Sequence, residues 1–253
     1  MASERTGYVQ SVTRAFDLLE QLANAGGVMG LSDLAAKLEL PVPTIHRLMR
    51  TLVNHGFAYQ LPSRQYALGP RLIRLGAIAT QTTGAWAQPI LDALVRDLGE
   101  TVNMASLESD RMIYIAQAAS PHAMRMFTEI GRRVYCHCTG VGKAVLATLP
   151  DDQVRAMIDR VGMPSQTDRT MTDIDSLLAD LSLIRRRGYA IDEGEQELGV
   201  RCYSVAVPNA TVPTAMSVSG PAVRMTPELR ERAIPRLQEA VRGLAEALYA
   251  TPA

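Results

Sequence analysis

The chain has 253 residues, of which 47% are hydrophobic and 21% are charged, and its formal net charge is zero. This length suits one large or two modest domains with real cores, and the composition excludes disordered and fibrous proteins. No apolar run reaches the roughly 18 residues of a membrane span, and the N-terminus lacks the apolar core of a signal peptide, so we expect a cytoplasmic protein without membrane contact.

The first forty residues predict two short helices. Ser11 and Ser32 are the expected N-terminal caps, because a serine hydroxyl accepts a bond from the first free backbone N–H groups. The inward side chains expected of the first helix recur at helical spacing: Val12, Phe16, Leu19 and Leu22. Pro41 and Pro43 then end the second helical pattern, since proline lacks a backbone donor.

A third helix is predicted from about Pro43 to His55. Its apolar stripe consists of Ile45, Leu48, Met49, Leu52 and Val53. The opposite face consists of Thr44, His46, Arg47, Arg50, Thr51 and Asn54. All of these polar side chains can donate a hydrogen bond and none is acidic, which suits phosphates and guanine edges. The pattern therefore predicts a DNA-contacting face.

After this helix the pattern changes to two short strands, 57–60 and 65–68, joined by a turn that carries Arg64. Two helices with a tight turn, followed by a hairpin, are typical of a winged helix-turn-helix, with the second helix in the major groove and the hairpin along the backbone. Residues 8–69 are thus the predicted DNA-binding domain. A protein-interaction module is the alternative that geometry alone leaves open.

The distribution of charge favours a DNA-binding domain over a protein-interaction module. Residues 40–91 contain no Asp or Glu but are rich in basic residues: Arg47, Arg50, Arg64, Arg71, Arg74, His46 and His55. Acids gather elsewhere, notably in 192–197. A neutral protein with one basic, acid-free segment is typical of local contact with a polyanion, although chance could also produce such a segment.

The remainder predicts a linker helix at 70–84 and a second domain at 85–253. Its expected helices are 90–98, 142–149, 151–161, 173–187 and 226–249, and its expected strands are 102–107, 112–116, 124–127, 189–191, 203–207 and 215–219. Adjacent hairpin-like strands with helices grouped between them favour an α+β fold built on an antiparallel sheet.

The stretch CHCTGVGKA, 136–144, admits three chemical interpretations. A metal site is disfavoured because in a strand Cys136 and Cys138 share a face and His137 points away, and because Cys-x-Cys lacks zinc-site spacing. Three cysteines also do not predict a disulfide framework. A phosphate loop is excluded because His137 replaces the required glycine and Ala144 the required Ser or Thr. A cysteine nucleophile is disfavoured because the adjacent histidine points away and no third residue can be named to orient it. Lys143 is expected near solvent or at a pocket rim.

What this stretch does predict is a helix that begins within 139–142. Free backbone N–H groups at such a terminus bind a small anion, typically a carboxylate. Ser217 and Ser219 share one strand face and are candidates to donate hydroxyls. Asp192 either accepts a bond from a ligand or caps a turn, and Arg125 or Arg201 is a candidate source of positive charge. We predict no cofactor and no metal.

Four separate blocks, in this order, resemble the IclR-type bacterial transcriptional regulators. The first comprises 44–48, 52–57 and 66–69, and the others are 137–144, 192–202 and 216–220. The resemblance implies a winged helix-turn-helix domain that a helix joins to a GAF-like effector domain. It also implies a homodimer or homotetramer on double-stranded operator DNA, more often a repressor than an activator and not an enzyme.

The resemblance further implies which residues bind the effector. Gly140 and Val141 would offer backbone groups; polar contacts would come from Asp192, Cys202, Ser217 and Ser219; apolar contacts would come from Met126, Val134 and Val200. Together with the helix terminus, these predict a small organic acid. The alternatives are a small-molecule-binding enzyme with an appended DNA-binding domain, for which only Cys202 and Asp192 offer chemistry, and a constitutive architectural DNA-binding protein.

Overall fold

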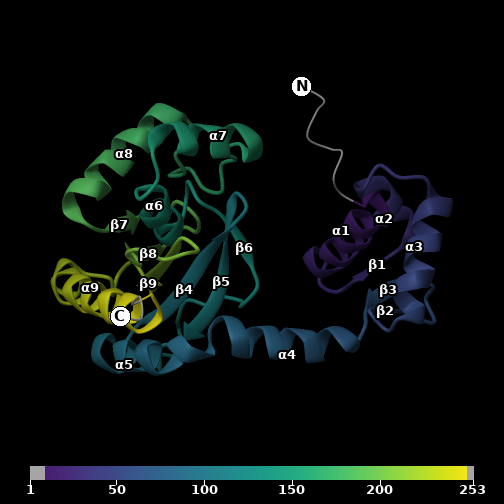
Figure 1. The fold of residues 1–253 in the computed structure, drawn as a ribbon, viewed down its shortest axis with the longest axis horizontal. Helices are drawn as coiled ribbons and strands as arrows, with labels where there is room; N and C mark the ends of the chain where they lie inside the picture. Colours follow the sequence, from purple (N-terminus) through teal and green to yellow (C-terminus); the bar gives the residue numbers. More distant parts are fainter. Residues whose placement is uncertain (1–8, 250–253) are drawn as a thin grey trace. The chain divides into compact units, whose positions relative to one another are not determined.

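The computed structural model describes residues 9–249 (Figure 1). The chain divides into two compact units, Met1–Ala79 and Thr80–Ala253, and the division falls within the helix α4, Arg71–Thr83. Each unit has its own hydrophobic core. None of the helices in the described part is both long and apolar enough to cross a membrane.

The first unit is a helical bundle closed by a small sheet. Its elements before α4 are α1 (Gln10–Asn24), β1 (Val28–Met29), α2 (Leu31–Lys37), α3 (Val42–Asn54), β2 (Ala58–Gln60) and β3 (Tyr66–Leu68). The strands are antiparallel in the order β1-β3-β2. Leu18, Leu22, Leu34, Ile45 and Met49 form the fully buried centre between the three helices. The predicted helix-turn-helix and hairpin are therefore present. The additional strand β1 was not predicted, because two residues are too few to show a strand pattern.

Both predicted serine caps in this unit are wrong. The helix α1 begins one residue before Ser11, because Val9 O already accepts from Val12 N at 2.9 Å, and its cap Val9 makes no side-chain bond. Similarly, α2 begins one residue before Ser32, with Gly30 O accepting from Leu34 N at 3.1 Å. In each helix the serine is exposed inside the first turn.

The predicted inward face of α1 is also partly wrong. Val12 and Phe16 are 49% and 63% exposed, whereas Leu18 and Leu22 are completely buried. Leu18 and Leu22 are one helical turn apart, so the true stripe follows their spacing and leaves the earlier apolar residues outside it. The first unit therefore exposes an apolar face on α1.

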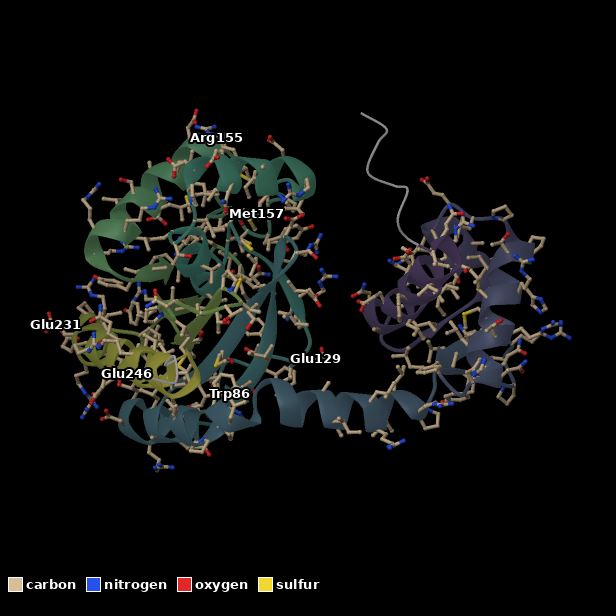
Figure 2. The ribbon with its side chains drawn as sticks, in the orientation of Figure 1. Trp86, Glu129, Arg155, Met157, Glu231 and Glu246 are labelled. Carbon is tan, nitrogen blue, oxygen red and sulfur yellow. The ribbon has the colours of Figure 1, made fainter. Side chains whose placement is uncertain are left out.

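The second unit is a six-stranded antiparallel sheet in the order β6-β5-β4-β9-β8-β7. The strands are β4 (Thr101–Glu108), β5 (Arg111–Ala118), β6 (Arg133–Tyr135), β7 (Ala190–Asp192), β8 (Val200–Ala206) and β9 (Thr214–Pro221). The helical elements are η1 (Ala85–Ala87), α5 (Gln88–Leu98), α6 (Gly140–Leu146), α7 (Asp151–Val161), α8 (Ile174–Arg187) and α9 (Pro227–Tyr249). This is the predicted α+β arrangement, with Trp86 at the turn between α4 and α5 (Figure 2).

Two cores lie on opposite faces of this sheet. One packs α5 and α9 against it, and the other packs α6, α7 and α8 (Figure 1). Successive residues of a strand point to opposite faces, and accordingly Met104 belongs to the first core and Ala105 to the second. Because α6 contacts mainly β7, β8 and β9, it lies over that side of the sheet.

One predicted strand is misplaced. Residues 124–127 lie in an irregular connection, and the strand that pairs with β5 is Arg133–Tyr135, with Val134 opposite Met112. The sequence of 124–127 alternates as a strand does, but no neighbouring strand pairs with it. Instead, side chains bond its backbone: Thr101 Oγ1 donates to Met126 O and Arg224 donates to Met124 O.

Candidate effector pocket and DNA-recognition helix

The exposed side of α3 carries the side chains predicted to contact DNA. His46, Arg47, Arg50 and Thr51 are exposed and Thr44 is half-buried, while the opposite side of the helix is buried in the core. Thr51 Oγ1 donates to Arg47 O at 3.1 Å, so its hydroxyl proton is used inside the helix and only its lone pairs face outward. The remaining donors of this face are Thr44, His46, Arg47, Arg50 and Asn54.

Arg64 lies at the tip of the β2–β3 hairpin and is exposed. Its backbone is in the left-handed region with φ 66°, and Gln60 Nε2 donates to Arg64 O at 3.3 Å. The exposed side chain of Arg64 therefore lies at a tight turn. The predicted phosphate contacts on α3 and at the hairpin tip are thus exposed in the first unit, and their contact with DNA stays a prediction.

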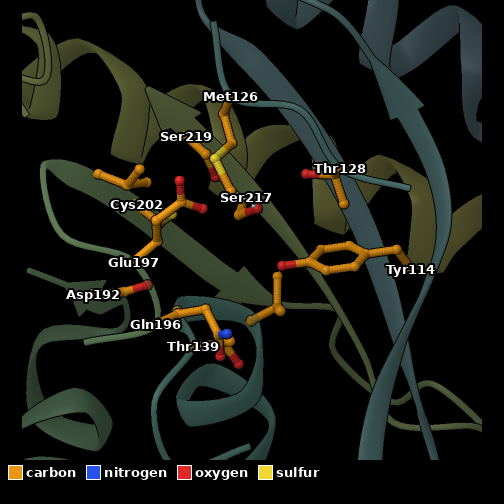
Figure 3. Close-up of a pocket in the computed structure, with 13 residues that line it drawn as sticks. Tyr114, Met126, Thr128, Thr139, Asp192, Gln196, Glu197, Cys202, Ser217 and Ser219 are labelled. Carbon is orange, nitrogen blue, oxygen red and sulfur yellow. Dashed lines mark hydrogen bonds between the residues drawn. The ribbon is translucent and has the colours of Figure 1, made fainter. Parts of the chain in front are cut away.

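The second unit contains a pocket between the N-terminus of α6, the loop after β7, strands β5, β8 and β9, and the connection between β5 and β6 (Figure 3). Predicted effector residues that line it are Gly140, Val141, Asp192, Cys202, Ser217, Ser219, Met126 and Val200. The structure does not bring Val134 to this pocket. Val134 is 5% exposed and packs in the core under α6–α8.

The first turn of α6 forms the floor of the pocket. Thr139 caps the helix: its Oγ1 accepts from Gly142 N at 3.2 Å and donates to Tyr135 O at 2.8 Å. The first intrahelical bond runs from Lys143 N to Thr139 O at 2.9 Å, so the N–H groups of Gly140 and Val141 precede it and point outward from the helix end. Thr139 was predicted to open this helix but not to line the pocket.

Two glycines of α6 are required by close packing. A Cβ on Gly140 would fall well inside contact distance of Ser204 Oγ on β8, and a Cβ on Gly142 would collide with the backbone of Cys136. Neither glycine needs an unusual φ angle. Their role is therefore to let the helix end approach the sheet and the preceding turn.

Asp192 occupies the end of β7 and is almost completely buried. Its Oδ1 accepts from Glu195 N at 2.7 Å, so it does cap the acidic turn while also lining the pocket. Burial raises the pKa of Asp192 to about 7, a change that the Glu195 backbone bond opposes and the Glu195 carboxylate reinforces. Near neutral pH this carboxyl therefore exists in both protonation states.

The prediction that Lys143 lies near solvent or a pocket rim is wrong. Lys143 is 1% exposed, and its Nζ donates to Glu195 Oε1 at 2.6 Å and to Asp180 Oδ2 at 2.9 Å. The two acids, one on α8 and one in the loop after β7, replace the water that the buried ammonium has lost. Lys143 thus links three elements beside the pocket without lining it.

The eye-catching residues 136–138 lie in a bend and turn rather than in a strand. Burial raises the pKa of both Cys136 and Cys138 to about 12, so these thiols are protonated and poor nucleophiles. His137 Nε2 lies 3.2 Å from Pro164 O, and burial lowers its pKa. Within the described residues there is no group of three His, Cys, Asp or Glu arranged to hold a metal ion.

Several pocket residues were not predicted: Tyr114, Thr128, Thr139, Gln196 and Glu197. Gln196 and Glu197 lie in the acidic run that drew attention to Asp192, whereas Tyr114 and Thr128 carry no local signal. Burial raises the pKa of Tyr114, so its hydroxyl keeps its proton. Figure 3 shows the Tyr114 hydroxyl directed at the centre of the pocket, across from Asp192.

Neither candidate arginine lines the pocket. Arg125 is exposed and donates to His122 O at 3.3 Å. Arg201 pairs with Glu193 at 2.7 Å and donates to Met225 O at 2.6 Å. Neither arginine therefore supplies a cation to the pocket.

Comparisons with known proteins agree with this architecture. The IclR helix-turn-helix model matches residues 11–62, and the model of the bacterial transcriptional regulator IclR C-terminal domain matches residues 77–248. Transcriptional repressor IclR of Escherichia coli strain K12 is 37% identical over 228 residues, which cover 87% of this chain and 83% of the relative. The acetate operon repressor of Salmonella typhimurium strain LT2 is 36% identical over 228 residues, with coverage of 87% and 83%.

Among solved structures, an IclR transcriptional regulator from Silicibacter sp. TM1040 superposes with a TM-score of 0.82 at 30% identity, covering 94% of this chain and 95% of that one. A helix-turn-helix unit followed by an effector-binding domain defines a transcriptional regulator rather than an enzyme. Since the family models match both parts and together span most of its length, the chain belongs to the IclR family of bacterial transcriptional regulators.

Proposed function

We propose that the protein is a repressor that binds operator DNA through α3 and the β2–β3 hairpin and responds to a small organic acid in the pocket beside α6. The observation that carries the proposal is the pocket itself, where outward N–H groups, hydroxyls and a partly protonated aspartate surround one cavity. Repression is supported by the two relatives named above, both of which are repressors.

The DNA contacts are assigned to Thr44, His46, Arg47, Arg50, Thr51 and Arg64. These side chains lie on α3 and at the hairpin tip in a stretch with no acid between residues 40 and 91, so phosphates meet no opposing charge there. Arg47 and Arg50 are the best suited to a bidentate contact with guanine. Operator binding also places the protein in the cytoplasm, with the DNA.

The effector is assigned as a small carboxylate. The cavity enclosed by the pocket residues is small, which favours an occupant with few heavy atoms. Outward N–H groups at a helix start favour an anion, and a protonated Asp192 presents a donor rather than a repelling charge. Ser217 and Ser219, both buried on β9, supply hydroxyls on the adjacent wall.

Self-association is supported by apolar side chains that the first unit leaves uncovered. Val12 and Phe16 on α1, Val9 directly before it, and Ile73 and Leu75 on α4 are all exposed. Isolated exposed apolar residues are ordinary, but several on one small unit favour a homodimer or homotetramer that buries them. Sedimentation velocity would then give a mass at least twice that of one chain.

Two assays test the proposal together. Thermal shift against small monocarboxylates, dicarboxylates and aromatic acids should identify acids that raise the melting temperature, because a ligand that binds only the folded state stabilises it. A gel shift on the promoter region of neighbouring genes, with and without such an acid, should show that it changes DNA affinity. Ser217→Ala combined with Ser219→Ala should remove the acid response and keep DNA binding. If DNA binding does not respond to any stabilising acid, the proposed regulation is wrong.

A further inference from the structure

Residues 119–132, which connect β5 to β6, form a strap across one side of the pocket. At one end Ser120 Oγ donates to Gly99 O at 2.6 Å, and at the other Gly131 N donates to Tyr114 O at 2.8 Å. Between these ends Thr101 Oγ1 donates to Met126 O at 3.2 Å, and a second bond ties the carbonyl of Met124 to Arg224 at 2.9 Å. The strap is therefore fixed to the sheet on both sides of the short stretch that faces the pocket.

Side chains along that short stretch alternate in direction. Met126 and Thr128 line the pocket, whereas Phe127 between them is 74% exposed. Glu129 again lies at the surface (Figure 2). Alternation of this kind is that of an extended chain, so fixing Met126 O also fixes the inward direction of Thr128. Thr128 is 5% exposed and Figure 3 shows it beside Tyr114 at the pocket wall.

The hydroxyl of Thr128 has no hydrogen-bond partner within the described part of the chain. Three other buried side-chain atoms share this condition: His137 Nδ1, Glu195 Oε2 and Ser204 Oγ. None of those three residues lines the pocket. Buried hydroxyls are normally paired, since leaving one unpaired loses the bond it made with water. Of these four buried atoms without a hydrogen-bond partner, Thr128 Oγ1 is the one whose residue lines the effector pocket.

Three other hydroxyls of the pocket, those of Ser217, Ser219 and Thr139, differ from Thr128 because protein groups already surround them. Ser217 Oγ and Ser219 Oγ are 3.5 Å apart, and Asn103 Nδ2 lies 3.5 Å from Ser219 Oγ. Thr139 Oγ1 is committed to the cap of α6. Since the cavity is small and both Gly140 and Thr128 line it, one occupant contacts the floor and the strap together.

We propose that Thr128 is a specificity-determining residue, whose hydroxyl binds a second oxygen of the effector while the carboxylate lies at the α6 end of the pocket. The effector is then a small acid with an additional hydroxyl or carbonyl oxygen, and the strap distinguishes it from an acid with only an alkyl chain. This inference rests on the proposed function, which supplies the carboxylate, and adds the group that selects among carboxylates.

The test compares three acids on the full-length protein by calorimetry and thermal shift: propionate, lactate and 3-hydroxypropionate. At least one hydroxy acid should bind the native protein about fivefold more tightly than propionate, the effect of one added hydrogen bond. In Thr128→Val, which keeps the shape and removes the hydroxyl, this preference should disappear while propionate binding is unchanged. Thr128→Ser keeps a hydroxyl and should retain the preference.

The unliganded melting temperature of Thr128→Val provides a further check. It should equal or exceed that of the native protein, because the variant removes a buried hydroxyl without a partner. A lower value would reveal a structural bond and overturn the proposal. Equal binding of the three acids, or a preference that survives in Thr128→Val, would also overturn it and leave the proposed function standing. No binding by any of the three acids would overturn this proposal, and the wider panel of acids would then decide the proposed function.

Discussion

The two units place their proposed functional residues in opposite ways. In the first unit they are consecutive turns of one exposed helix face, α3, together with a hairpin tip. In the second they come from five separate segments and are mostly buried around one cavity. A surface face tolerates substitution of single side chains with little loss of fold, whereas a buried site shares its residues with the core. Mutations should therefore separate function from stability in the first unit and couple the two in the second.

The largest effect is expected at the buried ion pairs of the second unit. Lys143→Met leaves Glu195 without its cation and should lower the free energy of unfolding by about 3–5 kcal/mol, measured by urea denaturation. The matched control is Arg155→Met, which removes an exposed ion pair with Asp175 and should cost about 0–1 kcal/mol. Similar losses of unfolding free energy in the two variants would show that burial does not make the Lys143 ion pairs more important for stability than an exposed pair.

A smaller loss of stability, joined to a loss of function, is expected at the pocket floor. Gly140→Ala pushes α6 away from Ser204 on β8 and should cost about 1–3 kcal/mol of unfolding free energy, as overpacking does. Binding of the acids found by thermal shift should be lost as well. Gly243→Ala on α9, where a Cβ meets nothing, is the control and should leave both properties intact. Retained acid binding in Gly140→Ala would contradict the assigned floor.

In the first unit the expected effect is on binding alone. Arg47→Ala should weaken operator binding by about 1–3 kcal/mol, or roughly tenfold to a hundredfold, in a gel shift at fixed salt. Its melting temperature and its response to acids should match those of the native protein, because Arg47 is exposed outside the core. Unchanged DNA affinity would reject α3 as the recognition helix.

The smallest effect is expected from pH, and it concerns the pocket only. As pH rises from 6 to 8, Asp192 passes its pKa of about 7 and becomes charged, so a carboxylate should bind up to about tenfold more weakly. Asp192→Asn should bind the same acid with little dependence on pH over this range, measured by calorimetry. A pH dependence that persists in Asp192→Asn would assign the titration elsewhere.

The same contrast explains what could be predicted from the sequence. The stripe of Ile45, Met49 and Leu52 fixes which side of α3 is buried, so its polar side follows directly from helical spacing. For the second unit, spacing predicted most helices and strands, but only the resemblance to a family assembled Gly140, Asp192 and the serines into one site. Contacts between residues far apart in sequence leave no local pattern from which they could be predicted.

The errors have the same origin. Lys143 was expected near solvent because charged residues are rarely buried without partners, and its partners lie on other elements: Asp180 on α8 and Glu195 after β7. Val134 was expected at the pocket, but its register opposite Met112 turns it into the core. Thr128 was missed because its inward direction follows from bonds made by Thr101 and Arg224, not from its neighbours in sequence.

The two tightly packed glycines of α6 have a consequence for how this motif is used in other sequences. Gly140 and Gly142 are dictated by the distance between the helix, β8 and the turn at Cys136, and they make no side-chain contact with any occupant. A motif built on them marks proteins that share the pocket floor, whatever molecule they bind. Ligand preference should instead be compared at positions such as Thr128, Gln196 and Cys202, where side chains can change without moving that floor.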